Sequence, residues 1–222
     1  MTLMKKGAEA DLYLEDFSRV LHPAGAGQVI IKHRISKRYR VPQLDLQLRE
    51  SRTALEAKLF ADAKIAGVPT PTIFEIDRVG MRLVMEFIDG EQVKLILNRL
   101  RPAKRRKLCR LIGRQIARLH KAGIVHGDLT TSNMILSPRG RVYFVDFGLG
   151  EYNPSLEARG VDLHLLRRAL QSTHFKVADE AYRAIIAGYK HEFGKGASEV
   201  IERAEEIERR GRYIPKEERT WH

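Results

Sequence analysis

The 222-residue sequence has one cysteine and no long apolar run, and each shortage excludes a class of protein. Because Cys109 stands alone, no disulfide can form within the chain, which suits a reducing compartment. No apolar stretch approaches the ~18 residues of a membrane-spanning helix, and residues 1–7 lack the apolar core of a secretory signal. We therefore expect a cytoplasmic protein with no membrane partner.

Glycine-rich phosphate-binding motifs are missing or reduced. The sequence contains no Gly-x-x-x-x-Gly-Lys-Ser/Thr element, which argues against a Walker-type ATPase. Gly7-Ala8-Glu9-Ala10 has a single glycine before a strand-like run at 12–14, where loops that cover nucleotide phosphates usually have three. We expect this turn to cover phosphates loosely, with Glu9 helping to shape it.

Basic residues are abundant and unevenly placed. Lys and Arg outnumber Asp and Glu by 40 to 28, which gives a net charge of +12 at pH 7. Segments 32–40 and 94–118 are rich in Lys and Arg and contain no acid, and a third basic cluster lies at 209–212. Solvated helix faces are one interpretation, and contact with a nucleic acid or an acidic partner is the other.

Hydrophobic patterning predicts an α+β fold with a β-rich first part and a mostly helical second part. In the first part we expect strands at 12–14, 29–31, 72–77 and 81–88. A long helix is expected over 44–66, with one apolar face made of Leu44, Leu48, Leu55, Leu59 and Ala63. Asp89-Gly90-Glu91 is the expected joint, which divides the chain into an N-terminal lobe (1–88), a C-terminal lobe (89–208) and a basic tail (209–222).

The second part is expected to be built mainly from helices. One begins near Pro102 and ends at Gly123, and its Cys109 and His120 are interpreted as packing residues. Short strands are expected at 134–136 and 142–145, followed by helices over 156–172, 177–193 and 197–210.

The most specific signal is the spacing of three polar residues. Asn133 follows Asp128 by five positions in His126-Gly127-Asp128-Leu129-Thr130-Thr131-Ser132-Asn133, and Asp146 follows Asn133 by 13 in Val145-Asp146-Phe147-Gly148. A turn after a buried strand would explain Asp146 alone but not the upstream acid and amide. The pattern matches the catalytic and metal-binding loops of protein kinases, with Asp128 as proton acceptor and Asn133 and Asp146 holding Mg²⁺ under ATP. His126 is interpreted as a scaffold for the backbone near Asp146.

The first part supplies the remaining candidates for an ATP site. Lys32 ends a strand-like run and is expected to meet the α- and β-phosphates, with Glu56 as its carboxylate partner and Glu50 as the competing choice. In the run 85–88, the backbone of Glu86 and Ile88 is expected to bind adenine while Met85 closes the back of the pocket. Gly7, Ala8 and Glu9 complete the predicted ATP-binding set.

Two departures from protein kinases concern substrate and control. Gly127 stands where many of them have Arg, and Thr130 where they usually have Lys. Only residues 149–161 separate Gly148 from Asp162, which we expect to begin the next helix, and no Ala-Pro-Glu follows. This segment is too short for an activation loop with a peptide platform, so we expect slow peptide phosphorylation and no activation-loop control.

Over its whole length the chain resembles the small atypical serine/threonine kinase subunit of the KEOPS complex. The resemblance rests on the 7–10 turn, on 39–45 and 52–57, on the loop 126–133 and on the truncated segment to 163. It implies a two-lobed protein-kinase-like fold with ATP and Mg²⁺ between the lobes, autophosphorylation on Ser or Thr, and an ATPase activity that supports threonylcarbamoyladenosine modification of tRNA.

The resemblance also implies partners. A threonylcarbamoyl-transferase catalytic subunit would dock on the C-terminal lobe and a small KEOPS subunit on the N-terminal lobe, with tRNA bound through the complex. The tail from 209 keeps the basic start of the family pattern and then diverges.

Other classes remain as alternatives. Aminoglycoside or choline kinase-like phosphotransferases also use His-Gly-Asp, but they generally have a longer helical lobe than the 60 residues after Asp162 allow. A RIO-type kinase also lacks a peptide platform but normally carries an extra N-terminal domain, for which we expect no room. A pseudokinase adaptor conflicts with the joint presence of Lys32, Asp128, Asn133 and Asp146.

Overall fold

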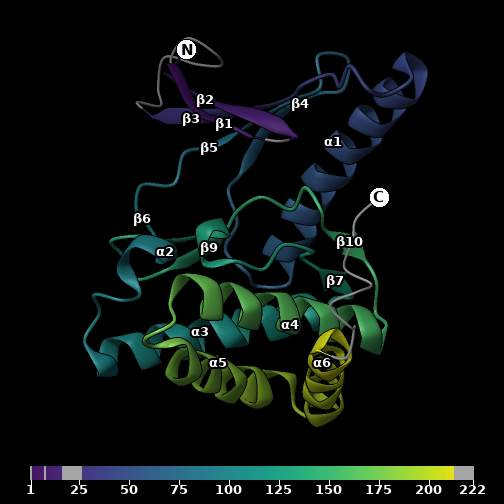
Figure 1. Cartoon of the computed structure of the whole chain (residues 1–222). Coiled ribbons are helices and arrows are strands. Elements are labelled where there is room, and N and C mark those ends of the chain that lie inside the picture. Colours follow the sequence, from purple (N-terminus) through teal and green to yellow (C-terminus); the bar gives the residue numbers. More distant parts are fainter. Residues whose placement is uncertain (1, 8, 17–26, 213–222) are drawn as a thin grey trace.

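A five-stranded antiparallel sheet forms the N-terminal part of the molecule (Figure 1). The computed structural model describes residues 2–7, 9–16 and 27–212. The sheet has the order β1-β2-β3-β5-β4 and is made of β1 (Thr2–Lys6), β2 (Ala10–Asp16), β3 (Gln28–Arg34), β4 (Ile73–Asp77) and β5 (Arg82–Glu86). The sequence predicted all of these strands except β1, whose residues are exposed throughout and show no apolar alternation. The Pro and Gly residues at 23–27 also predict a turn between β2 and β3, and this segment lies almost entirely outside the described residues.

Helix α1 (Pro42–Ile65) crosses beside the sheet, and only its second half follows the predicted apolar face. Pro42 begins it, and Gly67 follows its end with a φ of +80°. Leu59 and Ala63 are buried, but Leu44 is 51% exposed, so the predicted stripe is wrong in the first two turns. There the buried residue is Asp45, which pairs with two arginines, because a polar group can be buried only with partners.

The C-terminal part is mostly helical, as predicted (Figure 1). Its helices are α2 (Val93–Ile96), α3 (Pro102–Lys121), the 3₁₀ turn η2 (Thr131–Asn133), α4 (Leu156–Thr173), α5 (Ala178–Phe193) and α6 (Ala197–Arg212). Its strands are β6 (Glu91–Gln92), β7 (Ile124–Val125), β8 (Met134–Leu136), β9 (Val142–Phe144) and β10 (Glu151–Tyr152). β6, β8 and β9 make a three-stranded sheet, and β10 pairs with β7.

Helices α3 and α5 pack with their backbones in contact. A Cβ on Gly113 would lie 1.9 Å from the carbonyl oxygen of Ile185, and one on Gly188 would lie 2.1 Å from that of Arg110. Cys109 and His120 are buried on α3, in line with their predicted packing roles, and burial raises the pKa of the Cys109 thiol to about 12. None of the helices in the described ranges is long and apolar enough to cross a membrane.

The sequence suggested two starts for the helix after Gly148, at 156 and at Asp162, and the structure confirms the first. Helix α4 begins at Leu156, so Asp162 lies in its second turn and does not start it. Ser155 caps the helix by accepting a hydrogen bond from the N–H of Ala158 at 3.2 Å. Only residues 149–155 therefore separate Gly148 from the helix, which makes the segment even shorter than predicted.

Candidate active site

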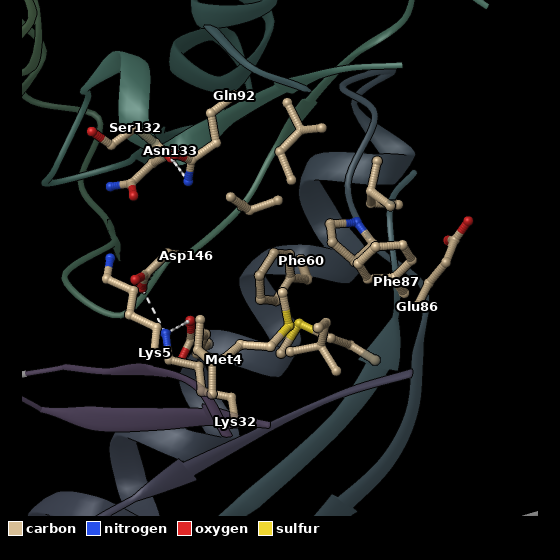
Figure 2. Close-up of a pocket in the computed structure, with 18 residues that line it drawn as sticks. Met4, Lys5, Lys32, Phe60, Glu86, Phe87, Gln92, Ser132, Asn133 and Asp146 are labelled. Carbon is tan, nitrogen blue, oxygen red and sulfur yellow. Dashed lines mark hydrogen bonds and ion pairs between the residues drawn. The ribbon is translucent and has the colours of Figure 1, made fainter. Parts of the chain in front are cut away.

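Lys32, Glu56 and Asp146 meet between the sheet and the helical part (Figure 2). The Nζ atom of Lys32 lies 2.6 Å from Oε1 of Glu56 and 2.6 Å from Oδ1 of Asp146. The competing candidate Glu50 is instead paired with Arg78 at the surface, at 2.7 Å. Of the two carboxylates considered from the sequence, the structure thus brings Glu56 to the lysine.

The electrostatics of this cluster favour the charged forms of Lys32 and Asp146. Burial alone would lower the pKa of Lys32, but the carboxylates of Glu56 and Asp146 outweigh it and raise that pKa. Burial would likewise raise the pKa of Asp146, but the Lys32 ammonium and the N–H of Gly148 lower it to about 2. Asp146 also has a φ of +67°, an uncommon backbone conformation for a residue with a side chain.

The two predicted metal-site loops lie side by side. The N–H of Val145 donates to the carbonyl of Asn133 at 2.9 Å, which continues the β8–β9 pairing and brings Asp146 next to the amide. The Nδ2 atom of Asn133 donates to the carbonyl oxygen of Asp128 at 3.0 Å and to its Oδ2 at 2.9 Å. Because the amide nitrogen is used in this way, the Oδ1 atom of Asn133 remains for a cation.

Asp162 holds the catalytic loop by its backbone, a role that sequence reasoning missed. The N–H groups of His126 and Gly127 donate to its two carboxylate oxygens at 2.7 and 2.9 Å. Burial would raise the pKa of Asp162, but its contacts with His120 and His126 keep that pKa lowered. An acid between Val161 and Leu163 on a helical segment was the available signal, since a buried carboxylate needs partners.

His126 is a buried scaffold residue. Its Nδ1 accepts the N–H of Asp128 at 3.4 Å, and a further hydrogen bond links the ring to the backbone of Val145. Burial lowers the pKa of His126 despite three nearby carboxylates, so the ring is neutral at pH 7. This arrangement agrees with a supporting role near Asp146.

The run 85–88, where the sequence predicts adenine binding, lines a cavity of about 340 Å³ beside Lys32 and Asp146 (Figure 2). Met85, Glu86 and Ile88 lie along it, and Lys32, Asn133 and Asp146 complete its wall. The volume is in the range of small-molecule sites. The lining residues that sequence reasoning missed include Met4, Lys5, Phe60, Phe87, Gln92 and Ser132.

The predicted phosphate-covering turn lies over a second cavity, of about 380 Å³, which shares Lys32 and Asp146 with the first. Gly7 and Glu9 line it together with Asp128, and Ala8 lies outside the described residues. The Glu9 carboxylate pairs with Arg40 at 3.3 Å and with Arg52 at 3.1 Å. Glu9 therefore ties the turn to α1.

Comparisons with known proteins identify relatives of this chain. The RIO domain family model matches residues 30–150. The KEOPS complex subunit Bud32 of Pyrococcus abyssi (strain GE5 / Orsay) is 50% identical over 222 residues, which cover 100% of this chain and 99% of that protein. The chain belongs to the Bud32 family.

Further relatives extend the match. A probable serine/threonine-protein kinase BUD32 homolog of Archaeoglobus fulgidus is 44% identical over 85% of this chain and 90% of its own length. A probable bifunctional tRNA threonylcarbamoyladenosine biosynthesis protein of Methanothermobacter thermautotrophicus is 42% identical over 95% of this chain. The chain spans only 36% of that bifunctional relative.

Membership of the Bud32 family makes the chain a kinase of RIO-like type, a class of enzymes that use ATP. The RIO domain match and the Bud32 relatives thus both describe this chain. Gly127 and Thr130 are thus two positions at which this Bud32 family member differs from many protein kinases.

In this Bud32 family member, Gly127 is a steric requirement. Its φ is +75°, and a Cβ there would lie 2.1 Å from the carbonyl oxygen of Leu149. The short segment after Gly148 thus packs directly on the catalytic loop, in the place that a side chain at position 127 would take.

Proposed function

We propose that the chain is an ATP- and Mg²⁺-dependent serine/threonine kinase and ATPase that acts as the kinase subunit of a KEOPS complex and supports threonylcarbamoyladenosine modification of tRNA. The meeting of Lys32, Asn133 and Asp146 at one end of the cavity, with Asp128 beside them, carries this proposal. The alternatives with a small-molecule acceptor lose support because two relatives that match 100% and 85% of the chain are named for KEOPS and for a serine/threonine-protein kinase.

The nucleotide would lie in the cavity with its adenine at the backbone of Glu86 and Ile88, beside Met85. ATP supplies the transferable phosphoryl group when bound. Asn133 Oδ1 and the Asp146 carboxylate are the oxygen ligands that would hold Mg²⁺, a cation that usually takes one or two protein ligands and completes its shell with phosphates and water. Lys32, held by Glu56, would contact the phosphates.

Asp128 would orient the acceptor hydroxyl or water. One of its carboxylate oxygens already accepts a hydrogen bond from Asn133, which fixes the side chain and leaves Oδ1 to accept the proton. The turn 7–9 would cover the phosphates from above, with Glu9 anchoring it to α1. This assignment treats 1–88 and 89–208 as the two lobes around the cleft and 209–222 as a basic tail.

The surface charge of α3 supports tRNA as a partner. The helix contains no acid, and the acids of α5 that face it, Glu180 and Glu192, are already paired with arginines of α3. Several exposed bases therefore keep net positive charge there, which suits a phosphate backbone: Lys104, Lys107, Arg110 and Arg114.

The bifunctional relatives support a transfer subunit as a second partner. In them a sequence like this chain makes up 36% of a protein whose name refers to threonylcarbamoyladenosine biosynthesis. We propose that the transferase subunit docks on the C-terminal lobe and a small KEOPS subunit on the N-terminal lobe, in the cytoplasm.

An ATP hydrolysis assay tests the proposal. With Mg²⁺, tRNA and the partner subunits, we expect turnover to rise above that of the isolated chain, and Asp146→Ala to abolish turnover while leaving the melting temperature near that of the wild type. Glu50→Ala should leave turnover within about twofold, because Glu50 forms an ion pair with Arg78 at the surface, away from Lys32. Full turnover by Asp146→Ala would contradict the site. If Asp146→Ala loses activity but tRNA does not raise the turnover of the wild type, the site assignment is supported and the KEOPS role is contradicted.

A further inference from the structure

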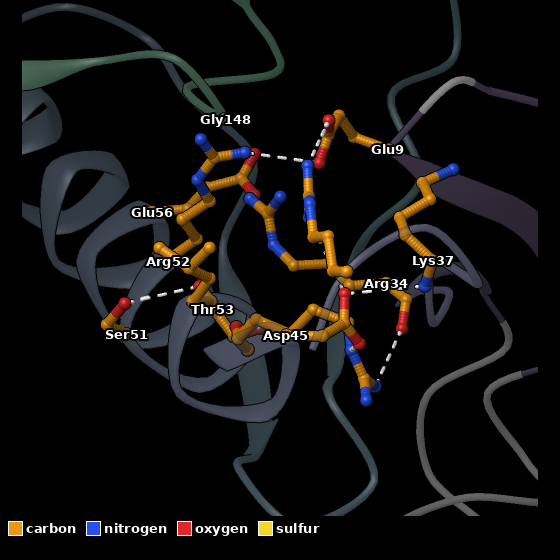
Figure 3. A network of polar contacts seen from close by, with 12 residues as sticks. Glu9, Arg34, Lys37, Asp45, Ser51, Arg52, Thr53, Glu56 and Gly148 are labelled. Carbon is orange, nitrogen blue, oxygen red and sulfur yellow. Dashed lines mark hydrogen bonds and ion pairs between the residues drawn. The ribbon is translucent and has the colours of Figure 1, made fainter. Parts of the chain in front are cut away.

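Arg34 gives the buried carboxylate of Glu56 a second cation (Figure 3). It lies two residues beyond Lys32 on β3, so both side chains point to the same face of the sheet. Its Nη2 is 2.5 Å from Oε2 of Glu56, while Lys32 holds Oε1. Arg34 is 3% exposed and Glu56 1%, so each carboxylate oxygen is neutralised away from water by its own cation.

The backbone of Arg34 is also held, on one side by the residue before β5 and on the other by α1. Its N–H donates to the carbonyl of Met81 at 2.9 Å, and its carbonyl accepts the Nη1 of Arg49 at 3.4 Å. Arg49 in turn pairs with the buried Asp45 at 2.7 Å (Figure 3). The polar contacts of Glu56 therefore continue along the first half of α1, the half that has no apolar face.

The count of charges shows what Arg34 adds. In the structure two cations, Lys32 and Arg34, meet two carboxylates, Glu56 and Asp146. When Asp146 turns to a metal ion and Lys32 to phosphates, Glu56 would lose part of its neutralisation if Lys32 were its only partner. An uncompensated buried carboxylate is strongly unfavourable. With Arg34 in place, Glu56 stays paired while Lys32 moves toward the nucleotide.

We propose that Arg34 is a positioning residue that locks Glu56, and with it α1, in the Lys32-bound arrangement whether or not nucleotide is present. The inference rests on the proposed function in that the cavity binds ATP. In protein kinases the position of the corresponding helix is a point of control by the activation loop. Here the contact that holds the helix joins Arg34 of β3 to Glu56 of α1 and involves no activation loop.

Hydrogen exchange with mass spectrometry tests the lock directly. We expect peptides around Glu56 to be equally protected in the wild type with and without Mg²⁺ and a non-hydrolysable ATP analogue. In Arg34→Gln the same peptides should exchange faster without the analogue and recover protection with it. Arg34→Lys should restore part of the protection, because it keeps the charge.

Binding and turnover provide a second readout. If only about a tenth of Arg34→Gln molecules hold α1 in place, the apparent Kd for the analogue rises about tenfold. The kcat at saturating ATP should change by less than about threefold, since bound molecules are again locked. Arg82→Gln is the matched control: it removes an exposed ion pair with Asp77 on the neighbouring strand and should change neither readout.

Each outcome decides the matter. Wild-type protection and affinity in Arg34→Gln overturn the lock. If Arg34→Gln does not fold, Arg34→Met, which keeps a long side chain without the charge, carries the same test, and protection in it that never depends on nucleotide, together with unchanged affinity, overturns the lock. If the wild type binds no analogue, the proposed function fails, while exchange of α1 without nucleotide still compares the variants.

Discussion

Replacing Gly127 by alanine tests the close approach between the catalytic loop and the segment after Gly148. The added Cβ would lie 2.1 Å from the carbonyl oxygen of Leu149 and 2.7 Å from its carbonyl carbon. Both atoms belong to the backbone, so they cannot rotate away. Gly140 is the matched control, because its φ of +76° is nearly that of Gly127 and nothing lies within 4 Å of its added Cβ.

The expected loss of stability has two parts. A positive φ costs an alanine about 1–2 kcal/mol, and this part applies to both variants. At Gly127 the backbone of Leu149 must also move by roughly 1 Å, and such overpacking costs about 1–3 kcal/mol. We therefore expect Gly140→Ala to lose about 1 kcal/mol and Gly127→Ala about 3 kcal/mol. For a chain of this size these losses correspond to Tm decreases of about 2–4 °C and 6–12 °C.

Urea unfolding followed by circular dichroism measures both variants on the same scale. Gly127→Ala should also lower ATP turnover, because Asp128 follows the displaced residue, whereas Gly140→Ala should not. Equal losses of stability in the two variants, within about 0.5 kcal/mol, would show that a Cβ at position 127 does not clash with the backbone of Leu149. That result would refute the steric reading of Gly127.

Three further predictions follow from burial and charge. Arg105→Ala should cost about 2–4 kcal/mol in urea unfolding, and Arg106→Ala less than about 1, because only Arg105 is buried in its contact with Glu180. Burial lowers the pKa of His126, so the unfolded chain binds a proton near pH ~6.5 that the folded chain does not. The urea midpoint should therefore fall as the pH drops below ~6.5, and His126→Gln should weaken that dependence. Asp162→Asn should lower kcat about 10- to 100-fold with little change in nucleotide affinity, measured by steady-state kinetics and titration, because it holds the loop and does not line the nucleotide cavity.

The sequence predicted the parts of the fold that depend on local patterns. Short runs of β-type residues located β2 and β3, and the helical stripe of α3 with its terminal Gly123 located that helix to within a few residues. The spacing of Asp128, Asn133 and Asp146 was informative because these residues lie in loops of fixed length next to short strands. Their separation in the sequence therefore determines where they lie relative to one another.

Features that depend on tertiary partners could not be predicted in this way. The start of α1 looked apolar in sequence, yet its exposed leucines and its buried Asp45 are set by arginines elsewhere in the fold. The role of Asp162 was missed because its partners, the N–H groups of His126 and Gly127, lie 35 or more positions earlier. Strand β1 has no apolar face, since it is an edge strand with exposed side chains.

The same tertiary contacts explain how the site can be assembled without an activation loop. Signalling kinases complete the Lys–Glu pair and the metal loop through phosphorylation and helix movement. In this chain Asp162 fixes the backbone of the catalytic loop, and Gly127 lets the short segment pack onto it. Arg34 holds Glu56 beside Lys32. Because all three contacts form within one chain, they hold the candidate catalytic groups together without help from an activation loop. We therefore expect control to act on access to the cleft, for example through a bound subunit, and not on the position of α1.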